Sequence, residues 1–469
     1  MSDDVETRPL LDHTHQDESN AQDSQDIYDR FNKVQRRSIL FVVAFAGLLP
    51  MFVWKAFVPT IPQVALDLSS DETTVSLAVS LTVLATAASS LFWASHSSVY
   101  GRRLMYLWGI PFLCIGSVGL ATATSIPALF VWRFLQCFGC SSRFALGTGV
   151  VGDVFRLEER GTALGIFYGV VLVGTMLAPV VGGAFTRYAS WRDLHVAVAL
   201  WGILDFLLIF FSLPETSHLH LTSNKGPTLT CSRRPRFVNP FKCLALLRSP
   251  NLFIAELAAA LALFTEFVLL IPLALTLGKQ YNITSEAVLG ACFLPQGIGN
   301  LIGAPIAGRM SDATVQKWRR KRGGKWVPED RLQAVYIGGL ILLPCSLIVF
   351  GFATTYIEGT IGLTISLFAL FTGGLGVDFV LNPANSYCID LVHSRSAEVT
   401  AAGNAFRSLV MAVGISLVVP SILRFGVLLT NCFAALSVLF VYGLVWLTIR
   451  FGDRMRAWVD IGYTTRADE

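Results

Sequence analysis

The sequence predicts an all-α integral membrane protein with twelve transmembrane helices arranged as two six-helix bundles. Of its 469 residues, 53% are apolar and only 14% are charged, whereas soluble domains are about 25% charged. Twelve stretches are long enough to cross a bilayer, which takes about 20 predominantly apolar residues. One long polar and basic segment, residues 214–249, divides these stretches six and six. Two similar halves are therefore expected.

The predicted elements follow the chain in a regular order. Residues 1–37 are acidic and contain few large apolar residues, so we expect a disordered cytosolic tail without a cleavable signal peptide. An N-terminal bundle (38–213), a cytosolic linker (214–249), a C-terminal bundle (250–449) and a second cytosolic tail (450–469) follow. The N-terminal spans are expected at 38–58, 74–94, 104–123, 127–150, 162–185 and 193–213. The C-terminal spans are expected at 250–277, 284–307, 331–353, 359–380, 398–419 and 426–449.

The basic residues predict the orientation in the membrane. With a cytosolic N-terminus, the cytosolic segments contain 28 of the 36 Lys and Arg residues, the outer loops four and the spans four. Cytosolic loops of membrane proteins have this excess of basic residues, so both termini are expected in the cytosol. The sequon that begins at Asn282 falls in a predicted outer loop and is a candidate glycosylation site.

Several other classes of protein are not expected. The sequence contains no Ser/His/Asp grouping and no metal-ligand spacing, so we expect neither an enzyme nor a metal or cofactor. Cys137 and Cys140 match C-x-x-C, but both lie in a predicted membrane helix, where packing is the expected role. The basic run 317–322 joins two spans and is expected to anchor the topology rather than to bind nucleic acid.

Charged turns recur at corresponding places in the two halves. Arg102 and Arg103 follow the second span and face Asp153 and Glu158 at the end of the fourth. In the second half Asp312 holds the corresponding position, and Asp390 ends the fourth span. Parallel six-helix repeats with a substrate path between them are typical of secondary transporters. We expect these charges to form a cytosolic latch that closes in one state and parts in the other, with topology anchoring alone as the alternative.

Two motifs indicate a family. In the fourth span, residues 133–136 (Arg-Phe-Leu-Gln) with Gly139 fit R-x-x-Q-G-x-G, with Cys137 in the first glycine slot. The fifth span fits the antiporter motif G-x8-G-x3-G-P-x2-G-G with Gly165, Gly174, Ala178 in place of one glycine, Pro179, Gly182 and Gly183. Residues 214–216 (Pro-Glu-Thr) are a further mark. From about 38 to 456 the chain resembles the fungal twelve-spanner drug:proton antiporters of the major facilitator superfamily, specifically their quinidine-resistance-like and citrate-exporter-like subgroup. One departure is Ser98, where the family has an acid.

The resemblance implies the major facilitator fold, a small-molecule substrate, and a proton gradient as the energy source without a cofactor. A monomer in the plasma membrane is expected. The fifth-span motif also has a physical interpretation. Gly174, Ala178, Gly182 and Gly183 are expected to form one stripe with Pro179, which lets helices approach and bends the span where helices slide. Ordinary close packing is the alternative.

Charges within the spans are the candidate functional groups. A charge at mid-bilayer costs at least about 2.5–3.5 kcal/mol, so it normally faces a cavity or a partner. Eight residues qualify: Lys55, Arg133, Arg143, Asp205, Glu256, Glu266, Asp378 and Arg407. Glu256 and Asp378 are expected near cytosolic ends, where their side chains can reach water, and are weighted lightly.

Each remaining charge receives an expected role. Arg133 and Arg407 are expected to contact a polar or anionic substrate, with hydrogen bonds from Gln136 and Asn404. Glu266 is the expected proton carrier, because a desolvated carboxylate can take up and release a proton as access alternates. Asp205 is a second proton-coupling candidate, although a static pair with Arg143 is the favoured interpretation. A static buried pair is the alternative for the others as well.

Lys55 and Glu266 are expected to form an outer gate. Lys55 lies about 17 residues into the first span and Glu266 about 16 into the seventh, so at 1.5 Å per residue both reach about 25 Å from the cytosolic side. The resembled fold brings these two helices together on the outer side when the protein faces inward. The alternative is two unrelated charges that reach outer water.

The resemblance predicts a proton-coupled antiporter that exports a small organic compound such as a drug, toxin or secondary metabolite. Export of organic acids such as citrate or itaconate is an alternative, favoured by the cations within the spans. A non-transporting nutrient sensor is a third possibility, but only a short tail follows Arg456 and a long signalling extension is expected of a sensor.

Overall fold

The computed structural model describes residues 30–155, 157–217, 240–273, 280–281, 283, 285–324, 327–392 and 396–459. Within these ranges every regular element is a helix. Most of the predicted N-terminal tail, most of the linker, and Asn282 lie outside the described residues.

The N-terminal half contains six long helices and a short helical connection at the end away from the chain termini. Its elements are α2 (Lys33–Ala56), η1 (Val58–Thr60), α3 (Ile61–Asp67), α4 (Glu72–Tyr100), α5 (Arg102–Ala121), α6 (Ile126–Val154), α7 (Leu157–Tyr188) and α8 (Trp191–Ser212). Polar caps set two of the starts, because the side chains of Asn32 and Asp71 accept hydrogen bonds from the first turns of α2 and α4.

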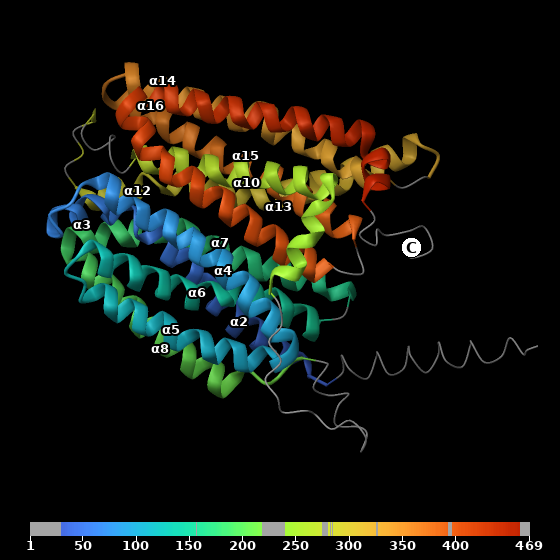
Figure 1. Cartoon of the computed structure of the whole chain (residues 1–469), viewed down its shortest axis with the longest axis horizontal. Coiled ribbons are helices and arrows are strands. Elements are labelled where there is room, and N and C mark those ends of the chain that lie inside the picture. The colour runs from blue at the N-terminus through green and yellow to red at the C-terminus, as the bar shows by residue number, and fades with distance from the viewer. Residues whose placement is uncertain are drawn as a thin grey trace, which may run out of the picture.

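The C-terminal half repeats this order. Its elements are η2 (Pro240–Arg248), α10 (Pro250–Pro272), α12 (Glu286–Ala291), α13 (Leu294–Lys321), η4 (Pro328–Ala334), η5 (Ile337–Leu342), α14 (Leu343–Tyr356), α15 (Gly359–Leu391) and α16 (Ser396–Trp458). Figure 1 shows the N-terminal half, in blue to green, below the C-terminal half, in yellow to red. α3 and α12 mark one end of the molecule, called here the α3 end, and the opposite end, where α2 begins and α16 finishes, is called the terminal end.

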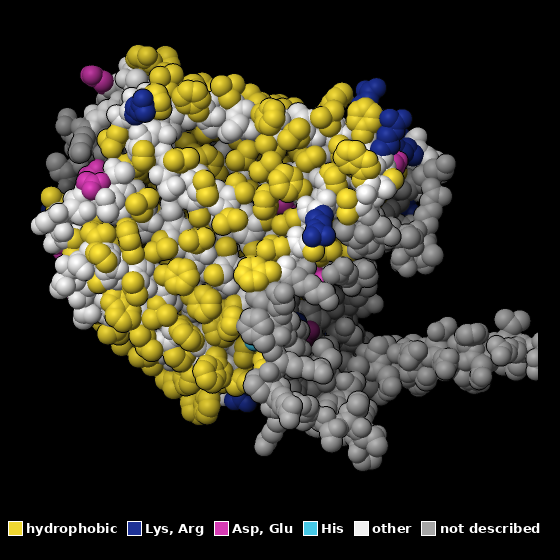
Figure 2. All heavy atoms as spheres, in the orientation of Figure 1, with side chains coloured by type: hydrophobic (Ala, Val, Ile, Leu, Met, Phe, Trp, Pro, Cys, Tyr) yellow, Lys and Arg dark blue, Asp and Glu magenta, His cyan; other side chains and the backbone are white. Residues whose placement is uncertain are grey.

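The described helices account for the twelve predicted spans. Ten helical stretches of the described residues are long and apolar enough to cross a membrane. One of them lies in α16, which breaks at Gly426 (φ 81°) and so contains two spans. α6 is a helix of 29 residues that is not among the ten. Figure 2 shows hydrophobic side chains over the middle of one face, with most charged side chains toward its two ends.

Several predicted spans are too short at the terminal end. α4 continues to Tyr100, α13 to Lys321 and α15 to Leu391. Hydropathy detects the part of a helix that lies in lipid, whereas a helix can continue into water on polar residues. The basic run 317–322 is therefore mostly helical, and Asp378 lies well inside a helix rather than near its end.

The hydrophobic core shows where the two halves join. Its main cluster combines residues of η1, α3 and α4, such as Val58, Ile61 and Val79, with residues of α10 and α16, such as Leu270 and Ile415. The other clusters each lie within one half. The halves therefore share a core toward the α3 end and have separate cores elsewhere.

Candidate proton and substrate sites

An ion pair joins the two halves. Lys55, at the end of α2, donates from Nζ to Oε1 of Glu266 on α10 at 2.5 Å, and each side chain is 7% exposed. Asn300 on α13 donates from Nδ2 to the same oxygen at 2.7 Å. Lys55 and Glu266, which the sequence placed at matching depths, are thus in direct contact. The Glu266 carboxylate has one charged donor and one neutral donor.

Asp378 on α15 belongs to the same group of residues. Its side chain is almost fully buried and interacts electrostatically with Glu266 and Lys55. Its Oδ2 atom has no hydrogen-bond partner among the described residues. A Cβ atom at Gly303 would lie 3.2 Å from this oxygen, so the backbone of α13 passes directly beside it. The expectation that Asp378 lies at a cytosolic helix end is wrong, because α15 continues to Leu391.

Arg133 is enclosed within the N-terminal half. It donates to the hydroxyl of Thr82, the side-chain oxygen of Gln136 and the carbonyl of Val53, at 2.7–2.9 Å. Its guanidinium also lies over the ring of Phe57, 4.5 Å from the centroid. The side chain is 0% exposed. In this conformation, contact between Arg133 and a substrate requires one of these partners to move.

Gln136 extends the Arg133 network to two further helices. Its amide nitrogen lies 2.9 Å from the hydroxyl of Ser117 on α5 and 3.3 Å from Nδ1 of His195 on α8. The sequence analysis did not single out His195, because a lone histidine in an apolar helix has no periodic signature. Its side chain is buried, and its Nε2 has no partner among the described residues.

Asp205 forms a pair with Arg143 inside the N-terminal half. The Arg143 Nε atom donates to Asp205 Oδ2 at 2.7 Å, and both side chains are 0% exposed. Arg143 also donates to the carbonyls of Gly139 and Cys140 on its own helix. This geometry corresponds to the static pair that the sequence analysis favoured over a proton-coupling role for Asp205.

Arg407 on α16 is the centre of a polar cluster in the C-terminal half. It donates to the side-chain oxygens of Asn385 and Asn404 and lies 3.0 Å from a carboxylate oxygen of Glu256 on α10. Asn404 is a site residue that the sequence predicted, whereas Asn385 is not. Glu256 is 3% exposed and paired, so the expectation that it reaches water at a helix end is wrong. The cluster offers amide and guanidinium donors together with one carboxylate.

The fifth-span motif on α7 packs against two different helices. A Cβ atom at Gly174 would lie 2.8 Å from the carbonyl oxygen of Leu48, and Gly182 likewise faces the carbonyl of Ala56, both on α2. Pro179 and Gly183 instead face Gly290 on α12 in the other half. The single stripe expected from the sequence is therefore wrong, because consecutive residues on a helix turn by about 100°. The motif forms two faces, one within its half and one between halves.

Charges at the terminal end of the first half surround the start of α5. Arg102 donates to Asp153 Oδ2 at 3.1 Å and to the hydroxyl of Ser97 at 2.7 Å. The Glu215 carboxylate accepts the backbone N–H groups of Arg102 and Arg103 at 2.9 and 3.2 Å, and so caps the N-terminus of α5. The Arg103 guanidinium donates to the carbonyl of Phe210. The side chain of Glu158 is outside the described residues.

The second half builds a corresponding cluster around a different arginine. Arg331 on η4 donates to Asp390 at 2.8 Å and to Asp312 at 3.0 Å. Arg456, in the last turns of α16, pairs with the buried Glu329. All of these pairs lie within one half. The Arg102–Asp153 contact expected of the latch is present, and its opening in another state stays a prediction. The sequence analysis did not single out Arg331 and Arg456 as partners.

Comparison with known proteins decides the family. The sequence model of the Major Facilitator Superfamily matches residues 43–415. The chain belongs to the Major Facilitator Superfamily. It is a transporter-family protein and a multi-pass membrane protein rather than an enzyme.

Curated relatives are fungal transporters. The chain is 35% identical to MFS antiporter QDR3 of Candida albicans over 192 residues, 41% of this chain and 27% of that protein. It is 23% identical to Multidrug transporter DTR1 of Candida glabrata over 478 residues, 92% of this chain and 86% of that protein. It is 27% identical to Citrate exporter 1 of Aspergillus niger over 186 residues, 40% of this chain and 36% of that protein. The match to QDR3 thus spans about a quarter of that relative.

Solved structures share the fold. A POT family transporter in complex with 5-aminolevulinic acid has a TM-score of 0.64 at 16% identity and covers 89% of this chain and 96% of its own. The human organic anion transporter MFSD10 (TETRAN) has a TM-score of 0.58 at 17% identity, with 87% and 99% covered. The chain therefore has the all-α fold of the superfamily.

In this major facilitator protein two close backbone approaches between α7 and the opposite half lie toward the α3 end. Gly290 and Gly297 approach the backbone of Pro179 and Met176, respectively, closely. By contrast, a Cβ atom at Gly165 or Gly169, nearer the terminal end of α7, would meet no described atom within 4 Å. The same holds for Gly308 on α13. α7 thus lies close to α12 and α13 near Pro179 and Met176.

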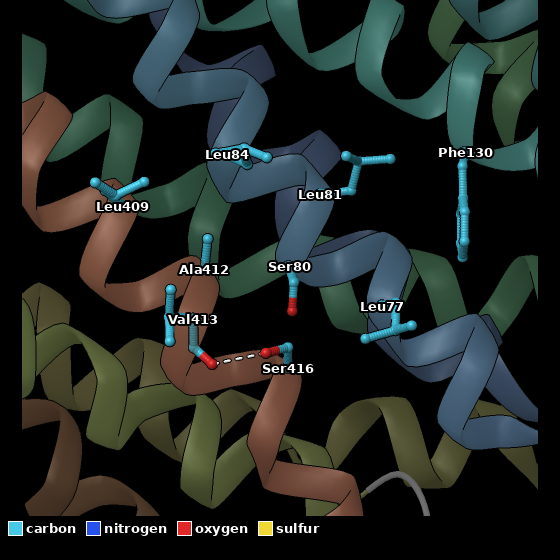
Figure 3. Close-up of a pocket in the computed structure, with 9 residues that line it drawn as sticks. All are labelled: Leu77, Ser80, Leu81, Leu84, Phe130, Leu409, Ala412, Val413 and Ser416. Atoms are coloured by element: carbon cyan, nitrogen blue, oxygen red, sulfur yellow. Dashed lines mark hydrogen bonds between the residues drawn. The ribbon is translucent and has the colours of Figure 1, made fainter.

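An apolar groove lies between the halves and is lined by residues of α4, α6 and α16 (Figure 3). Its volume is about 300 Å³. The lining residues are Leu77, Ser80, Leu81, Leu84, Phe130, Leu409, Ala412, Val413 and Ser416. Ser416 donates to the carbonyl of Val413, whereas the Ser80 hydroxyl has no partner among the described residues. None of the paired charges described above lines this groove.

Proposed function

We propose that this transporter is a proton-coupled antiporter that exports a small organic compound, such as a drug, toxin or secondary metabolite, from the cytosol. The proposal places both termini in the cytosol, so that the α3 end faces outward, in the plasma membrane, with the monomer as the working unit and no cofactor. The observation that carries it is the Lys55–Glu266 ion pair, because this pair combines a titratable group with the junction between the two halves.

The pair supports coupling because its strength depends on protonation. While Glu266 is ionised, its attraction to Lys55 holds α10 against α2 and stabilises the conformation closed at the α3 end. A proton on Glu266 removes the charge, so the attraction falls and opening toward the outside becomes easier. The α7 motif supports the movement, since Gly174 and Gly182 face α2 while Pro179 and Gly183 face the other half.

The polar cluster around Arg407 is the proposed substrate site, with Asn404 and Asn385 as further donors. Export of an organic acid is the second candidate, because a carboxylate substrate can compete with Glu256 for Arg407. The curated relatives include both a multidrug transporter and a citrate exporter. In this proposal Arg133 and Gln136 contact the substrate only after the N-terminal network rearranges.

Substrate-dependent proton flux in proteoliposomes tests the proposal. Citrate, itaconate and a panel of cationic drugs are added in parallel to vesicles that contain the full chain and a pH-sensitive dye. We expect at least one compound to release protons in wild type and in Asp193→Asn, a surface control on α8, but not in Glu266→Gln. Transport of a compound without any proton flux in wild type would contradict proton coupling.

A further inference from the structure

The residues around Lys55 hold more negative than positive charge. Glu266 and Asp378 contribute two carboxyl groups, and Lys55 contributes one ammonium. These are the charged groups that the described structure sets against Asp378, since the neighbouring polar residue of α13 is the neutral Asn300. All three side chains are buried. A buried charge without a counter-ion is costly, so the group is neutral when one carboxyl group holds a proton.

The two carboxyl groups are not equivalent. Glu266 accepts hydrogen bonds from Lys55 at 2.5 Å and from Asn300 at 2.7 Å, so its carboxylate has a counter-ion and a neutral donor. Asp378 Oδ2 has no donor among the described residues and lies beside the bare backbone at Gly303. If Asp378 were ionised, its Oδ2 atom would lack a hydrogen bond from the described residues, and its charge would be repelled by that of Glu266. A proton therefore belongs on Asp378 while Lys55 is paired with Glu266.

The contacts with α13 show which of the two carboxyl groups lies nearer the terminal end. The helix runs from the α3 end to the terminal end. Asn300 contacts Glu266, and Gly303, three residues further on, lies beside Asp378. At 1.5 Å per residue this is a step of about 4.5 Å toward the terminal end. Asp378 thus lies nearer than Glu266 to the side on which the proposed antiporter releases its proton.

We propose that Asp378 holds the transported proton in the conformation closed at the α3 end, and that Glu266 and Asp378 form a two-step proton relay. This inference rests on the proposed antiport. When the α3 end opens and Lys55 leaves, Glu266 loses its counter-ion and takes a proton from outer water, forming an O–H bond. On closure Lys55 returns, the Glu266 O–H bond breaks, and the proton passes to Asp378. Release from Asp378 to cytosolic water restores its carboxylate.

Charge-removing variants do not tell the two acids apart. In Asp378→Asn the charge of the remaining Glu266 is balanced by Lys55. In Glu266→Gln the charge of the remaining Asp378 can likewise be balanced by Lys55. Both variants are expected to lose the bound proton and with it the coupling. Conservative exchanges that keep every charge, Asp378→Glu and Glu266→Asp, are the informative pair, because only the residue that holds the proton changes its own carboxylic-acid spectrum.

Infrared difference spectroscopy on the purified full chain in lipid nanodiscs tests the relay without any substrate. Wild type is expected to show a C=O stretching band of a protonated carboxylic acid that disappears as the pH is raised. The band should shift in Asp378→Glu, stay in place in Glu266→Asp, vanish in Asp378→Asn, and remain unchanged in Asp193→Asn.

Two results would overturn the assignment. A band that shifts in Glu266→Asp would place the proton on Glu266, and a band that is indifferent to both conservative exchanges would place it on another acid. Asp378→Glu keeps the test valid if Asp378→Asn fails to fold. The readout is independent of transport, so a failure of the proposed antiport appears in the proteoliposome assay and a failure of this inference appears in the spectrum.

Discussion

Two buried ion pairs in this transporter differ in what they connect. Arg143–Asp205 is 0% exposed on both sides and lies wholly within the N-terminal half. Lys55–Glu266 is 7% exposed on both sides, joins the two halves, and lies beside a second carboxyl group. Arg143–Asp205 can stay intact during alternating access because both residues move with the same half. Lys55–Glu266 must separate if the α3 end opens. Burial alone therefore does not identify a coupling site. What identifies it is that the ion pair joins the two halves of the protein.

The largest effect is expected from breaking the static pair. Arg143→Ala leaves Asp205 buried without its counter-ion, and such a change costs about 3–5 kcal/mol. We expect a marked fall in the thermal unfolding temperature of the protein in detergent and in its surface expression. The double variant Arg143→Met with Asp205→Leu should recover much of the loss. A single variant with wild-type stability would break the distinction between the two pairs.

The next effect is loss of coupling with retained structure. Glu266→Gln keeps the side-chain volume nearly constant and removes the titratable group, and Asn300 can still hydrogen-bond the new amide. Counterflow of a transported compound should therefore survive, while accumulation driven by a pH gradient disappears. Expression should match that of Asp193→Asn. If pH-driven accumulation persists, the proton does not pass through this pair, and Asp205 becomes the better candidate.

Arg133 tests whether an enclosed cation can still serve transport. Arg133→Ala removes hydrogen bonds to Thr82, Gln136 and Val53 but leaves no carboxylate without a partner. We therefore expect near-normal surface expression together with transport reduced to background. Normal transport by this variant would show that the network is only structural. Arg133→Lys keeps the charge but cannot make all three hydrogen bonds, so its transport rate should lie between those of wild type and Arg133→Ala.

The smallest effect is expected at the terminal end of the first half. Glu215→Ala removes the cap on the N–H groups of Arg102 and Arg103 and should cost about 1 kcal/mol of stability. Glu215→Gln, which can still accept, should cost less. Thermal unfolding of the two variants side by side measures the difference. Equal unfolding temperatures for Glu215→Ala and wild type would mean that the cap contributes nothing.

The fold was predictable because it depends on long-range averages of the sequence. Twelve apolar stretches and the distribution of Lys and Arg determine the number of spans and predict their orientation. The ends of helices were not predictable in the same way, since α15 continues on polar residues to Leu391. Because of that error, Asp378 was expected at a helix end, although it lies inside α15 beside Lys55 and Glu266.

Residues of the site were predictable only where a charged residue stands out within an apolar span. Lys55 and Glu266 were paired from their matched depths together with the helix arrangement of the resembled fold. Neutral partners such as Asn300, Asn385 and His195 carry no such signal, because a single amide or imidazole in a helix is compatible with many environments. The two faces of the α7 motif also depend on which helices surround it, and the spacing of the glycines does not contain that information.

In the proposed mechanism, protonation controls the contact between the halves at the α3 end. Distances between spin labels at Leu66 on α3 and Ile361 on α15, both exposed, measure it in nanodiscs, in a background without reactive native cysteines. We predict that lowering the pH shifts the wild-type distance distribution toward longer values, because a proton on Glu266 weakens the pair with Lys55. In Glu266→Gln the distribution should not respond to pH. A wild-type distribution that is the same at both pH values would contradict the account.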